Sequence, residues 1–360
     1  MSHAPASGAG QDGSGPRPLI VHADDLGLAH AFNAGIREAA RSGLLTSTCV
    51  RVNGSAYEAA MDEVAPECPQ LGIGIHLNLV EGRTRRGSVP RSSLLCDADG
   101  TYRATFTSLL RGQRNAALMQ EIEADYRDQI EIALRRLPRP DHLNSHQHSH
   151  AVPALFELVC RLALEYRIPY VRLPRERFYV AGSAADHAHA WYPVNLAKVG
   201  ILNALAVANE RTARQHGVPT NEWLVGIAYT GYMNTERIHA GLWAVASSPG
   251  LVELLLHPCR LVLGREDRYL NDQVRHYVLD PAREVEVRAL LDPSLPGRLQ
   301  EQGWGVTCYA CVAGSQHPVP SERVLPQPRA VPEIANAVPR SHVHTNPQNW
   351  GTGAVASKQQ

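Results

Sequence analysis

Short apolar segments alternate with amphipathic ones from residue 19 to residue 312, and this alternation constrains the fold more than any other feature of the chain. Alternating strand-like and helix-like segments are typical of parallel strands joined by crossover helices. The predicted strands are Leu19–Ala23, Leu45–Val52, Leu71–Leu79, Asp141–Ser145, Tyr170–Leu173, Trp223–Tyr229, Val252–His257 and Gly305–Val312. The predicted helices are Phe32–Ser42, Ala56–Val64, Ala116–Arg136, Pro153–Arg167, Asn195–His216, Thr235–Ala246 and Pro281–Leu291.

Polar side chains that can do chemistry follow these strands at their carboxyl ends. In a β/α barrel the carboxyl ends of all strands meet at one face, where the active site forms. An open doubly wound sheet gathers ligands only at its switch point, which cannot unite so many strands. The sequence therefore predicts a single α/β domain over residues 18–314, an irregular, distorted β/α barrel of the TIM type. The polar residues concerned are Asp24, Asp25, His76, His146, Arg172, Tyr229 and His257.

The ends of the chain differ in composition from the predicted barrel. Residues 1–17 are rich in Gly, Ser, Pro and Ala and residues 315–360 in Pro, Ser and Asn, so we predict a disordered leader and a disordered tail. The leader lacks the apolar core of a secretory signal, and the longest apolar stretch, Val199–Ala208, is too short to cross a bilayer. We expect a cytoplasmic protein without a transmembrane segment.

The overall charge gives no sign of a charged partner. Lys and Arg balance Asp and Glu, so the formal net charge is zero and we expect no binding to nucleic acid. The sequence does not specify an oligomeric state, and a homo-oligomer stays open.

Cysteine usage does not indicate a disulfide framework, because the chain has seven cysteines, an odd number. Cys308 and Cys311 have the spacing of half a zinc site or of a redox pair. No second pair or nearby histidine completes such a site, so we interpret this segment as part of the last predicted strand.

Two adjacent carboxylates, Asp24 and Asp25, end the first predicted strand. Neighbouring buried carboxylates repel each other, and they are tolerated only if a cation lies between them or one keeps a proton. An Asp-Asp pair alone would fit an Asx-type turn. The histidines favour a metal or proton-relay site instead. His76 ends another strand-like segment, and residues 142–150 contain four histidines, of which His146, His148 and His150 share a face if the strand continues.

Several motifs occur in an order that resembles the YdjC-like (ChbG/HpnK) carbohydrate deacetylases, over roughly residues 18 to 312. The resemblance implies a distorted β/α barrel that removes N-acetyl groups from amino sugars with one bound divalent cation, Mg²⁺ or Zn²⁺. The stretch Trp223–Met233 looks most like the HpnK branch, which is associated with lipid-linked sugars, so the acetylated amino-sugar substrate is either free or lipid-linked. The motifs are Val21-His-Ala-Asp-Asp-Leu-Gly27, Leu44-Leu-Thr-Ser-Thr48, Val52-Asn-Gly54, Gly72-Ile-Gly-Ile-His-Leu-Asn-Leu79, His142-Leu-Asn-Ser-His-Gln-His-Ser-His150, Val171-Arg-Leu-Pro174 and Leu256-His-Pro258.

Carried over position by position, the resemblance implies that Asp25, His76 and His146 are the metal ligands and that Asp24 is the catalytic base. The cation would activate a water molecule, and Asp24 would remove its proton. One departure is Asn144, which stands where the family usually has an aspartate. A carboxylate that would orient a histidine is thus replaced by a neutral amide, which bears on metal affinity and on the pH optimum.

The leaving amine needs a proton, and His257 and His148 are the donors within reach. We prefer His257 because it comes from a different strand, although a structural role ahead of Pro258 is the alternative. We expect His148 and Arg172 to contact the substrate. Arginines in such positions also often do no more than bridge carboxylates at the rim of a barrel.

Two other functions fit part of the pattern. Phosphoesterase and amidohydrolase barrels also gather histidines and aspartates, but they tend to place a His-x-His pair on the first strand, where this chain has Asp24 and Asp25. A catalytically inactive sugar-binding barrel is the second alternative, which Asn144 favours slightly. Release of acetate, with and without a chelator, would distinguish the three.

Overall fold

The computed structural model describes residues 15–86, 92–183, 186–187, 191–262, 272–280 and 283–314. The predicted tail and the first fourteen residues of the predicted leader lie outside this range. The first strand begins at Arg17, one residue before the predicted start of the domain.

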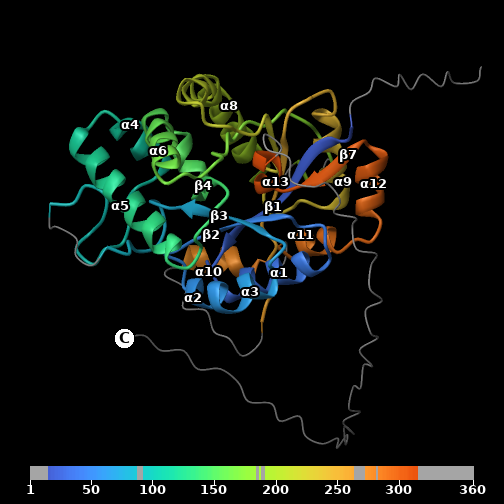
Figure 1. Ribbon diagram of the computed structural model, residues 1–360, viewed down its shortest axis with the longest axis horizontal. Coiled ribbons are helices and arrows are strands. Elements are labelled where there is room, and N and C mark those ends of the chain that lie inside the picture. The colour runs from blue at the N-terminus through green and yellow to red at the C-terminus, as the bar shows by residue number, and fades with distance from the viewer. Residues whose placement is uncertain are drawn as a thin grey trace, which may run out of the picture. The chain divides into compact units, whose positions relative to one another are not determined.

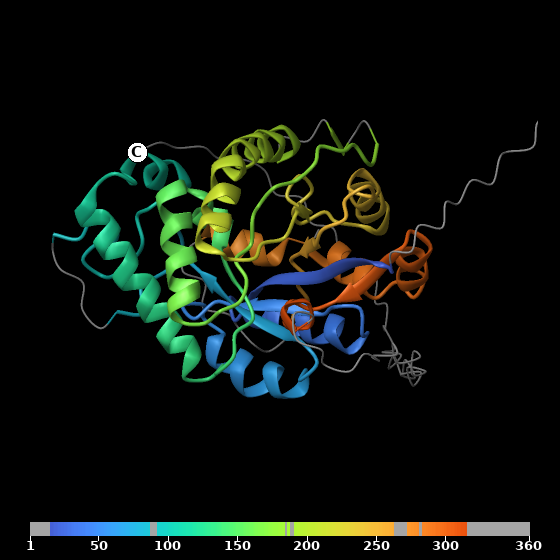
Figure 2. The same cartoon turned by 45° about the horizontal axis from the view of Figure 1, so that its top comes forward.

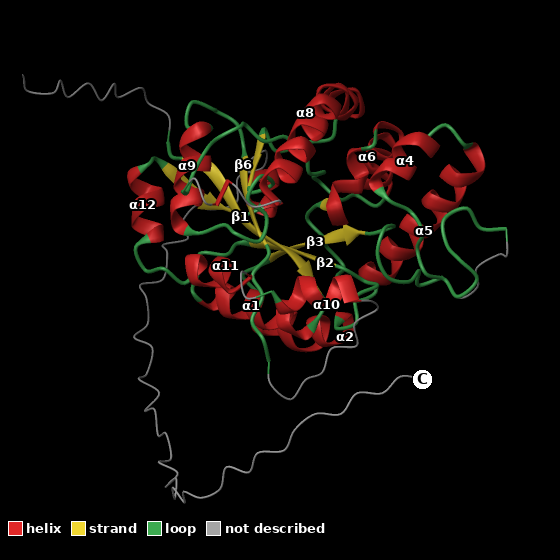
Figure 3. Ribbon diagram, turned by 180° about the vertical axis from the view of Figure 1, so that it is seen from behind, coloured by secondary structure: helices red, strands yellow, loops and turns green. Residues whose placement is uncertain are grey.

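Seven parallel strands form one sheet around the first strand, β1, and Figure 3 shows them at the centre with the helices around them. Their order is β4-β3-β2-β1-β6-β5, and β7 pairs with the first residues of β1. Seven of the eight predicted strands therefore occur, and the α/β fold class is confirmed. The strands are β1 (Arg17–Leu26), β2 (Ser47–Val50), β3 (Gly72–Leu77), β4 (Leu143–Ser145), β5 (Trp223–Val225), β6 (Val252–Leu256) and β7 (Trp304–Thr307).

The segment 170–175 connects the two outer strands of the sheet, β4 and β5. On one side, the Leu143 N–H donates to the carbonyl of Tyr170 over 2.8 Å. On the other side, the Leu224 N–H donates to the carbonyl of Arg175 over 2.8 Å. The predicted strand Tyr170–Leu173 is thus reduced to a single bridge between Leu143 and Val171. Because these bonds join both edges, the sheet curls into a distorted barrel.

Helices cover the outside of the sheet (Figure 1), and Figure 2 shows α6 between α5 and α8. Every predicted helix occurs with different ends, whereas α3, α4, a 3₁₀ helix after β4, α10, α12 and α13 were not predicted. The helices are α1 (His30–Arg41), α2 (Tyr57–Ala59), a π-helical turn (Ala60–Val64), α3 (Ala65–Glu67), α4 (Phe106–Gly112), α5 (Ala116–Leu134), a 3₁₀ helix (His146–Ala151), α6 (Pro153–Glu165), α8 (Trp191–His216), α9 (Thr235–Ala244), α10 (Asp272–Leu279), α11 (Arg283–Leu290), α12 (Leu295–Glu301) and α13 (Tyr309–Gly314).

The prediction of a strand from Gly305 to Val312 is wrong in its second half. β7 ends at Thr307, and the chain turns at Cys308 into the short helix α13. Cys308 and Cys311 face each other across this turn and form a disulfide. A turn of helix brings residues three apart onto one side, which a strand would not do.

The core of the barrel is apolar and continuous. β6 is buried along its whole length and β1 from its third residue onward, as expected for parallel strands covered on both faces. β6 nevertheless contains one buried acid, Glu253, which is 0% exposed. Within the described part of the chain, no helix combines the length and hydropathy needed to span a bilayer.

Candidate active site

The backbone at the end of β1 directs both aspartates toward the same histidine. Asp25 has a left-handed φ of 72°, and the register with β2 shifts between Ala23 and Leu26. In a regular strand the two neighbouring side chains would point to opposite faces, but this turn brings them together. Asp24 Oδ1 lies 3.9 Å from Nδ1 of His76, and Asp25 Oδ1 lies 3.6 Å from Nε2 of the same ring. Aspartate is among the residues that adopt this conformation most readily.

Two glycines make this turn possible through close backbone contact. Gly27 has a φ of 88°, and its N–H donates to Oδ1 of Asn33 over 2.8 Å. Gly54 packs against it so closely that a Cβ at Gly54 would lie 2.0 Å from the carbonyl oxygen of Gly27. Any larger residue at position 54 would therefore push the turn that carries the aspartates.

Asp25, His76 and His146 form a buried group whose ligand atoms all lie within 4.8 Å of one another. Asp25 Oδ1 is 3.3 Å from Nδ1 of His146 and 3.6 Å from Nε2 of His76. Two ligands of a tetrahedral ion, each about 2.1 Å away from it, lie about 3.4 Å apart. Asp25 Oδ1 is also buried without a hydrogen-bond donor. An unsatisfied buried anion facing two imidazole nitrogens fits a divalent cation well.

Each histidine of this group is oriented by a polar residue at its other nitrogen. His146 contacts Oε2 of Glu81 through Nε2 at 2.8 Å, which leaves Nδ1 facing Asp25. His76 contacts Oδ1 of Asn144 through Nδ1 at 2.7 Å, which leaves Nε2 facing Asp25. An acceptor at one ring nitrogen fixes the proton there, so the other nitrogen has a free lone pair. This is the arrangement that a metal ligand requires.

The two histidines differ in basicity because their surroundings differ. Burial lowers the pKa of His76 to about 4. Burial and Arg51 act in the same direction on His146, but the carboxylates of Asp25 and Glu81 outweigh them and raise the pKa of His146. Burial alone would raise the pKa of Asp25, yet His146 and His76 hold that pKa below its ordinary value. A carboxylate that is ionised and a neutral His76 are the forms that bind cations.

Asp24 accepts hydrogen bonds from four residues beneath the cavity. Arg172 pairs with it through two bonds, Nη1 to Oδ2 at 2.9 Å and Nη2 to Oδ1 at 2.8 Å. Oδ1 also accepts from His22 at 3.0 Å, from Cys49 at 3.1 Å and from Asn144 at 3.2 Å. Burial alone would raise the pKa of Asp24, but the Arg172 guanidinium holds that pKa well below its usual range. Asp24 is therefore ionised, and Oδ2 is its less occupied oxygen.

Arg172 does not occupy the place expected of a substrate-binding residue. It is 0% exposed, and both edges of its guanidinium are taken by the carboxylates of Asp24 and Glu253. It is also absent from the described residues that line the cavity. Arg172 instead bridges two carboxylates, which is the alternative role considered for it in the sequence analysis.

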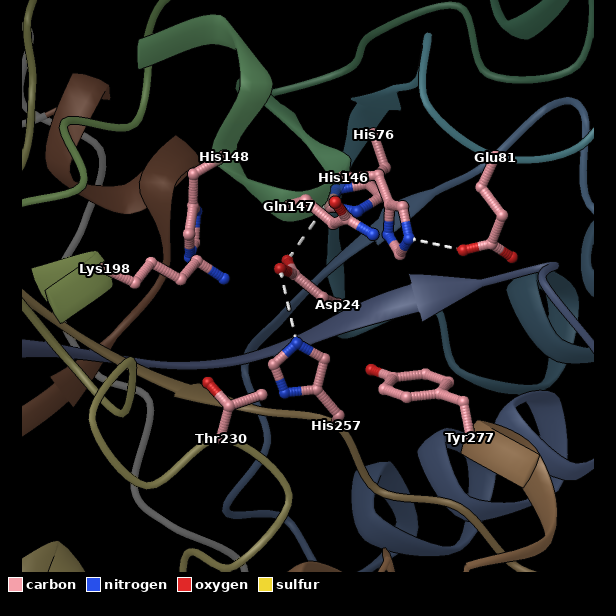
Figure 4. Close-up of a pocket in the computed structure, with 10 residues that line it drawn as sticks. All are labelled: Asp24, His76, Glu81, His146, Gln147, His148, Lys198, Thr230, His257 and Tyr277. Atoms are coloured by element: carbon pink, nitrogen blue, oxygen red, sulfur yellow. Dashed lines mark hydrogen bonds and ion pairs between the residues drawn. The ribbon is translucent and has the colours of Figure 1, made fainter. Parts of the chain in front are cut away.

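A cavity of about 130 Å³ opens above Asp24, and its walls come from two parts of the chain (Figure 4). One wall follows β1, β3 and β4, and the other comes from α8, α10 and the segments after β5 and β6. In Figure 4, His257 and Tyr277 face His76 and His146 across the opening. The lining residues are Asp24, His76, Glu81, His146, Gln147, His148, Lys198, Thr230, His257 and Tyr277.

The expectation that three alternate histidines converge is wrong, because β4 ends at Ser145. Gln147 and His148 have left-handed φ angles of 53° and 56°, so the chain turns sharply where the strand was expected to continue. His146 and His148 still reach the cavity. His150 turns away, and its Nδ1 contacts the hydroxyl of Ser145 at 2.6 Å.

His257 lies at the cavity on the side of Asp24. Its Nε2 is 3.8 Å from Oδ2 of Asp24, and burial lowers the pKa of His257 to about 3. It therefore starts as a neutral imidazole. Lys198 of α8 lines the same wall, and burial lowers its pKa as well.

Five lining residues were not predicted from the sequence, namely Glu81, Gln147, Lys198, Thr230 and Tyr277. Glu81 lies four residues beyond the end of β3, so its distance from a strand end was a usable signal. Tyr277 could not be predicted in this way, because it lies on helix α10 and not after a strand. Its hydroxyl donates to Oδ2 of Asp25 over 3.3 Å.

The fold and this site define the protein class, an α/β barrel with a cluster of carboxylates and imidazoles at the carboxyl ends of its strands. The family described as YdjC-like protein matches residues 18–301. The chain belongs to this family, which confirms the resemblance of its motifs.

The chain is also similar to carbohydrate deacetylases and to a solved structure. It is 40% identical over 158 residues to a carbohydrate deacetylase of Brevibacillus brevis, which is 43% of this chain and 59% of that protein. It is 34% identical over 151 residues to a carbohydrate deacetylase of Clostridium beijerinckii, which is 42% of this chain and 58% of that protein. The chain thus spans about three-fifths of the length of these relatives.

One structural neighbour is a candidate cellobiose-phosphate cleavage protein of Enterococcus faecalis V583. Its crystal structure superimposes with a TM-score of 0.61 at 22% identity, over 82% of this chain and 99% of that chain. At this identity the likeness concerns the fold, which it confirms.

Proposed function

We propose that this protein is a metal-dependent hydrolase that removes N-acetyl groups from an amino-sugar carbohydrate. The observation that carries the proposal is the group of Asp25, His76 and His146, which lies beside the ionised Asp24 at a cavity. Membership of the YdjC-like family and the named carbohydrate deacetylases among the relatives support it.

Asp25, His76 and His146 would hold the cation. One carboxylate and two imidazoles suit Zn²⁺ by ligand type, and Mg²⁺ if water completes the shell. When bound, a divalent cation supplies a Lewis acid for the acetyl carbonyl and lowers the pKa of water. Arg51 is 0% exposed, and its Nη1 lies 3.9 Å from Oδ1 of Asp25, which is beyond hydrogen-bond distance.

Asp24 would act as the general base. Its Oδ2 has a single close donor, Arg172, and faces His257, whereas Oδ1 accepts from several donors. Oδ2 is thus the atom that can accept a proton from an attacking water. General-base catalysis of this kind contributes typically ~10²–10⁴-fold to the rate.

His257 would return the proton to the leaving amine. Its Nε2 is 3.8 Å from Oδ2 of Asp24, and its low pKa keeps it neutral before the reaction. A neutral imidazole at this place can take the proton from Asp24 and donate it to the leaving amine. His148 keeps its assignment as a substrate contact, and Lys198 of α8 is a second candidate because it also lines the cavity.

The cavity limits which part of the substrate is enclosed. About 130 Å³ is below the roughly 300–1,000 Å³ of sites that enclose a whole small-molecule ligand. We therefore propose that the acetamido group enters the cavity and that most of the sugar lies outside. This arrangement accepts free amino sugars in the cytoplasm and lipid-linked ones alike.

The test is the release of acetate from N-acetylated oligosaccharides by metal-loaded protein, with and without a chelator. We expect one acetyl group to be lost per sugar, only when metal is present, as measured by mass spectrometry. Release of phosphate from sugar phosphates would instead favour a phosphoesterase. Sugar binding that needs no metal and gives no turnover would favour an inactive binding barrel.

A further inference from the structure

A chain of buried hydrogen bonds leads from Asp24 away from the cavity, through the barrel, to helix α13. Arg172 contacts Asp24 with the end of its guanidinium, through Nη1 and Nη2. It contacts Glu253 with its side edge, through Nε to Oε1 at 3.0 Å and Nη2 to Oε1 at 2.5 Å. Oε2 of Glu253 then accepts a hydrogen bond from the hydroxyl of Tyr309.

The three residues that follow Asp24 in this series of hydrogen bonds are fully buried. Arg172, Glu253 and Tyr309 are each 0% exposed. A planar guanidinium held at two edges by two carboxylates cannot rotate without breaking a charge-assisted bond at one of them. The contact with Glu253 therefore determines how the guanidinium presents Nη1 and Nη2 to Asp24.

Tyr309 is itself fixed by its surroundings at the start of α13. Its ring stacks on His142 with centroids 4.4 Å apart and contacts Tyr170 at 5.2 Å. The disulfide between Cys308 and Cys311 spans the turn on which it lies. The hydroxyl consequently has one defined place, against Glu253.

We propose that Glu253 and Tyr309 are positioning residues for the deacetylation, acting through Arg172 on Asp24. Tyr309 holds the carboxylate of Glu253, Glu253 holds the guanidinium of Arg172, and Arg172 holds Oδ2 of Asp24 toward the cavity. Both residues are 0% exposed and neither is among those lining the cavity, so neither touches the substrate. This inference rests on the proposed function, because it needs Asp24 to be the base.

Tyr309→Phe tests the inference with the loss of one hydroxyl. We expect kcat for acetate release to fall about 10-fold while KM and metal content stay unchanged, because a small misplacement of a catalytic group slows the chemistry. The matched control is Tyr170→Phe, which removes a hydroxyl from the neighbouring ring without touching Glu253. It should leave kcat unchanged. Thermal unfolding of both variants checks that the fold is kept.

The pair Glu253→Gln and Glu253→Gln/Tyr309→Phe tests whether Tyr309 acts through Glu253. If it does, Tyr309→Phe has no further effect on kcat once Glu253 is replaced. Multiplied effects of the two changes would overturn the inference, and so would an unchanged kcat in Tyr309→Phe. Failure of the proposed function looks different, because wild-type protein would then release no acetate at all.

Discussion

Asn144 lies between His76 and Asp24 and bonds to both. Its Oδ1 is 2.7 Å from Nδ1 of His76, and its Nδ2 donates to Oδ1 of Asp24 over 3.2 Å. The amide can do both because it carries an acceptor and a donor on one planar group. An aspartate here would also orient His76 but would face the carboxylate of Asp24 with a like charge.

Replacing Asn144 separates these two contacts. Asn144→Leu should weaken metal binding about 10–100-fold, because His76 loses the acceptor that orients it. Asn144→Asp should keep metal binding at least as tight, because a carboxylate is a stronger acceptor for Nδ1 of His76. Isothermal titration calorimetry with Zn²⁺ measures the metal affinity of both variants. Equal affinities for the leucine variant and wild type would show that the contact does not orient the ligand.

Asp24→Asn and Asp25→Asn should differ in metal content. Asp24→Asn should keep the metal and lose turnover by ~10²–10⁴-fold, because an amide cannot take the proton. Asp25→Asn should lose metal, because a neutral oxygen replaces an anionic ligand, and added metal should restore part of the activity. Elemental analysis beside acetate release checks both variants. If only Asp24→Asn lost metal, Asp24 would be the ligand and Asp25 the base.

Metal binding should weaken as the pH falls through the pKa of His146. Asp25 and Glu81 raise that pKa, so His146 takes up a competing proton at a higher pH than an isolated histidine, whose pKa is ~6.5. Glu81→Gln keeps an acceptor for Nε2 but removes one of the two charges. The midpoint of metal loss should therefore move to lower pH in this variant. Metal content after dialysis across the pH range gives the midpoint, and a midpoint that does not move contradicts the assignment.

Gly54→Ala should destabilise the fold. Its Cβ would meet the backbone of Gly27 at 2.0 Å, and backbone atoms cannot move aside as a flexible side chain would. We expect the free energy of unfolding to fall by about 1–3 kcal/mol. Gly200→Ala is the control, because its Cβ meets nothing within 4 Å on α8, and it should stabilise by up to about 1 kcal/mol. Urea unfolding measures both, and a stable Gly54→Ala protein would mean that the turn can shift.

The fold could be predicted because its signal is local. Apolar runs such as Val252–Leu256 and amphipathic ones such as Pro153–Glu165 define their own structure, and their alternation defines the parallel sheet. The end of the chain was harder. The segment 305–312 is largely apolar and fits a strand. β7 nevertheless pairs with β1 only as far as Thr307 opposite Ile20, because β1 pairs with β2 from His22 onward, and α13 follows.

The candidate site could be predicted where it follows strand ends. Asp25, His76 and His146 could be placed together because parallel strands bring their carboxyl ends to one edge. The course of the chain after β4 could not be predicted. Gln147 and His148 adopt left-handed φ angles, and neither is a glycine that would have indicated such a turn. The burial of Arg172 could not be predicted for another reason. Its partner Glu253 lies within a predicted strand, and the sequence does not indicate that the two side chains meet.

The two walls of the cavity give the protein two regions that can change independently. The proposed metal ligands all precede residue 147, whereas Lys198, Thr230, His257 and Tyr277 all follow residue 197. Mutations that accumulate in the later region can alter which sugar fits without disturbing the ligands. Relatives that diverged in substrate should therefore carry their differences mainly in the later region, and directed evolution toward new substrates should begin there.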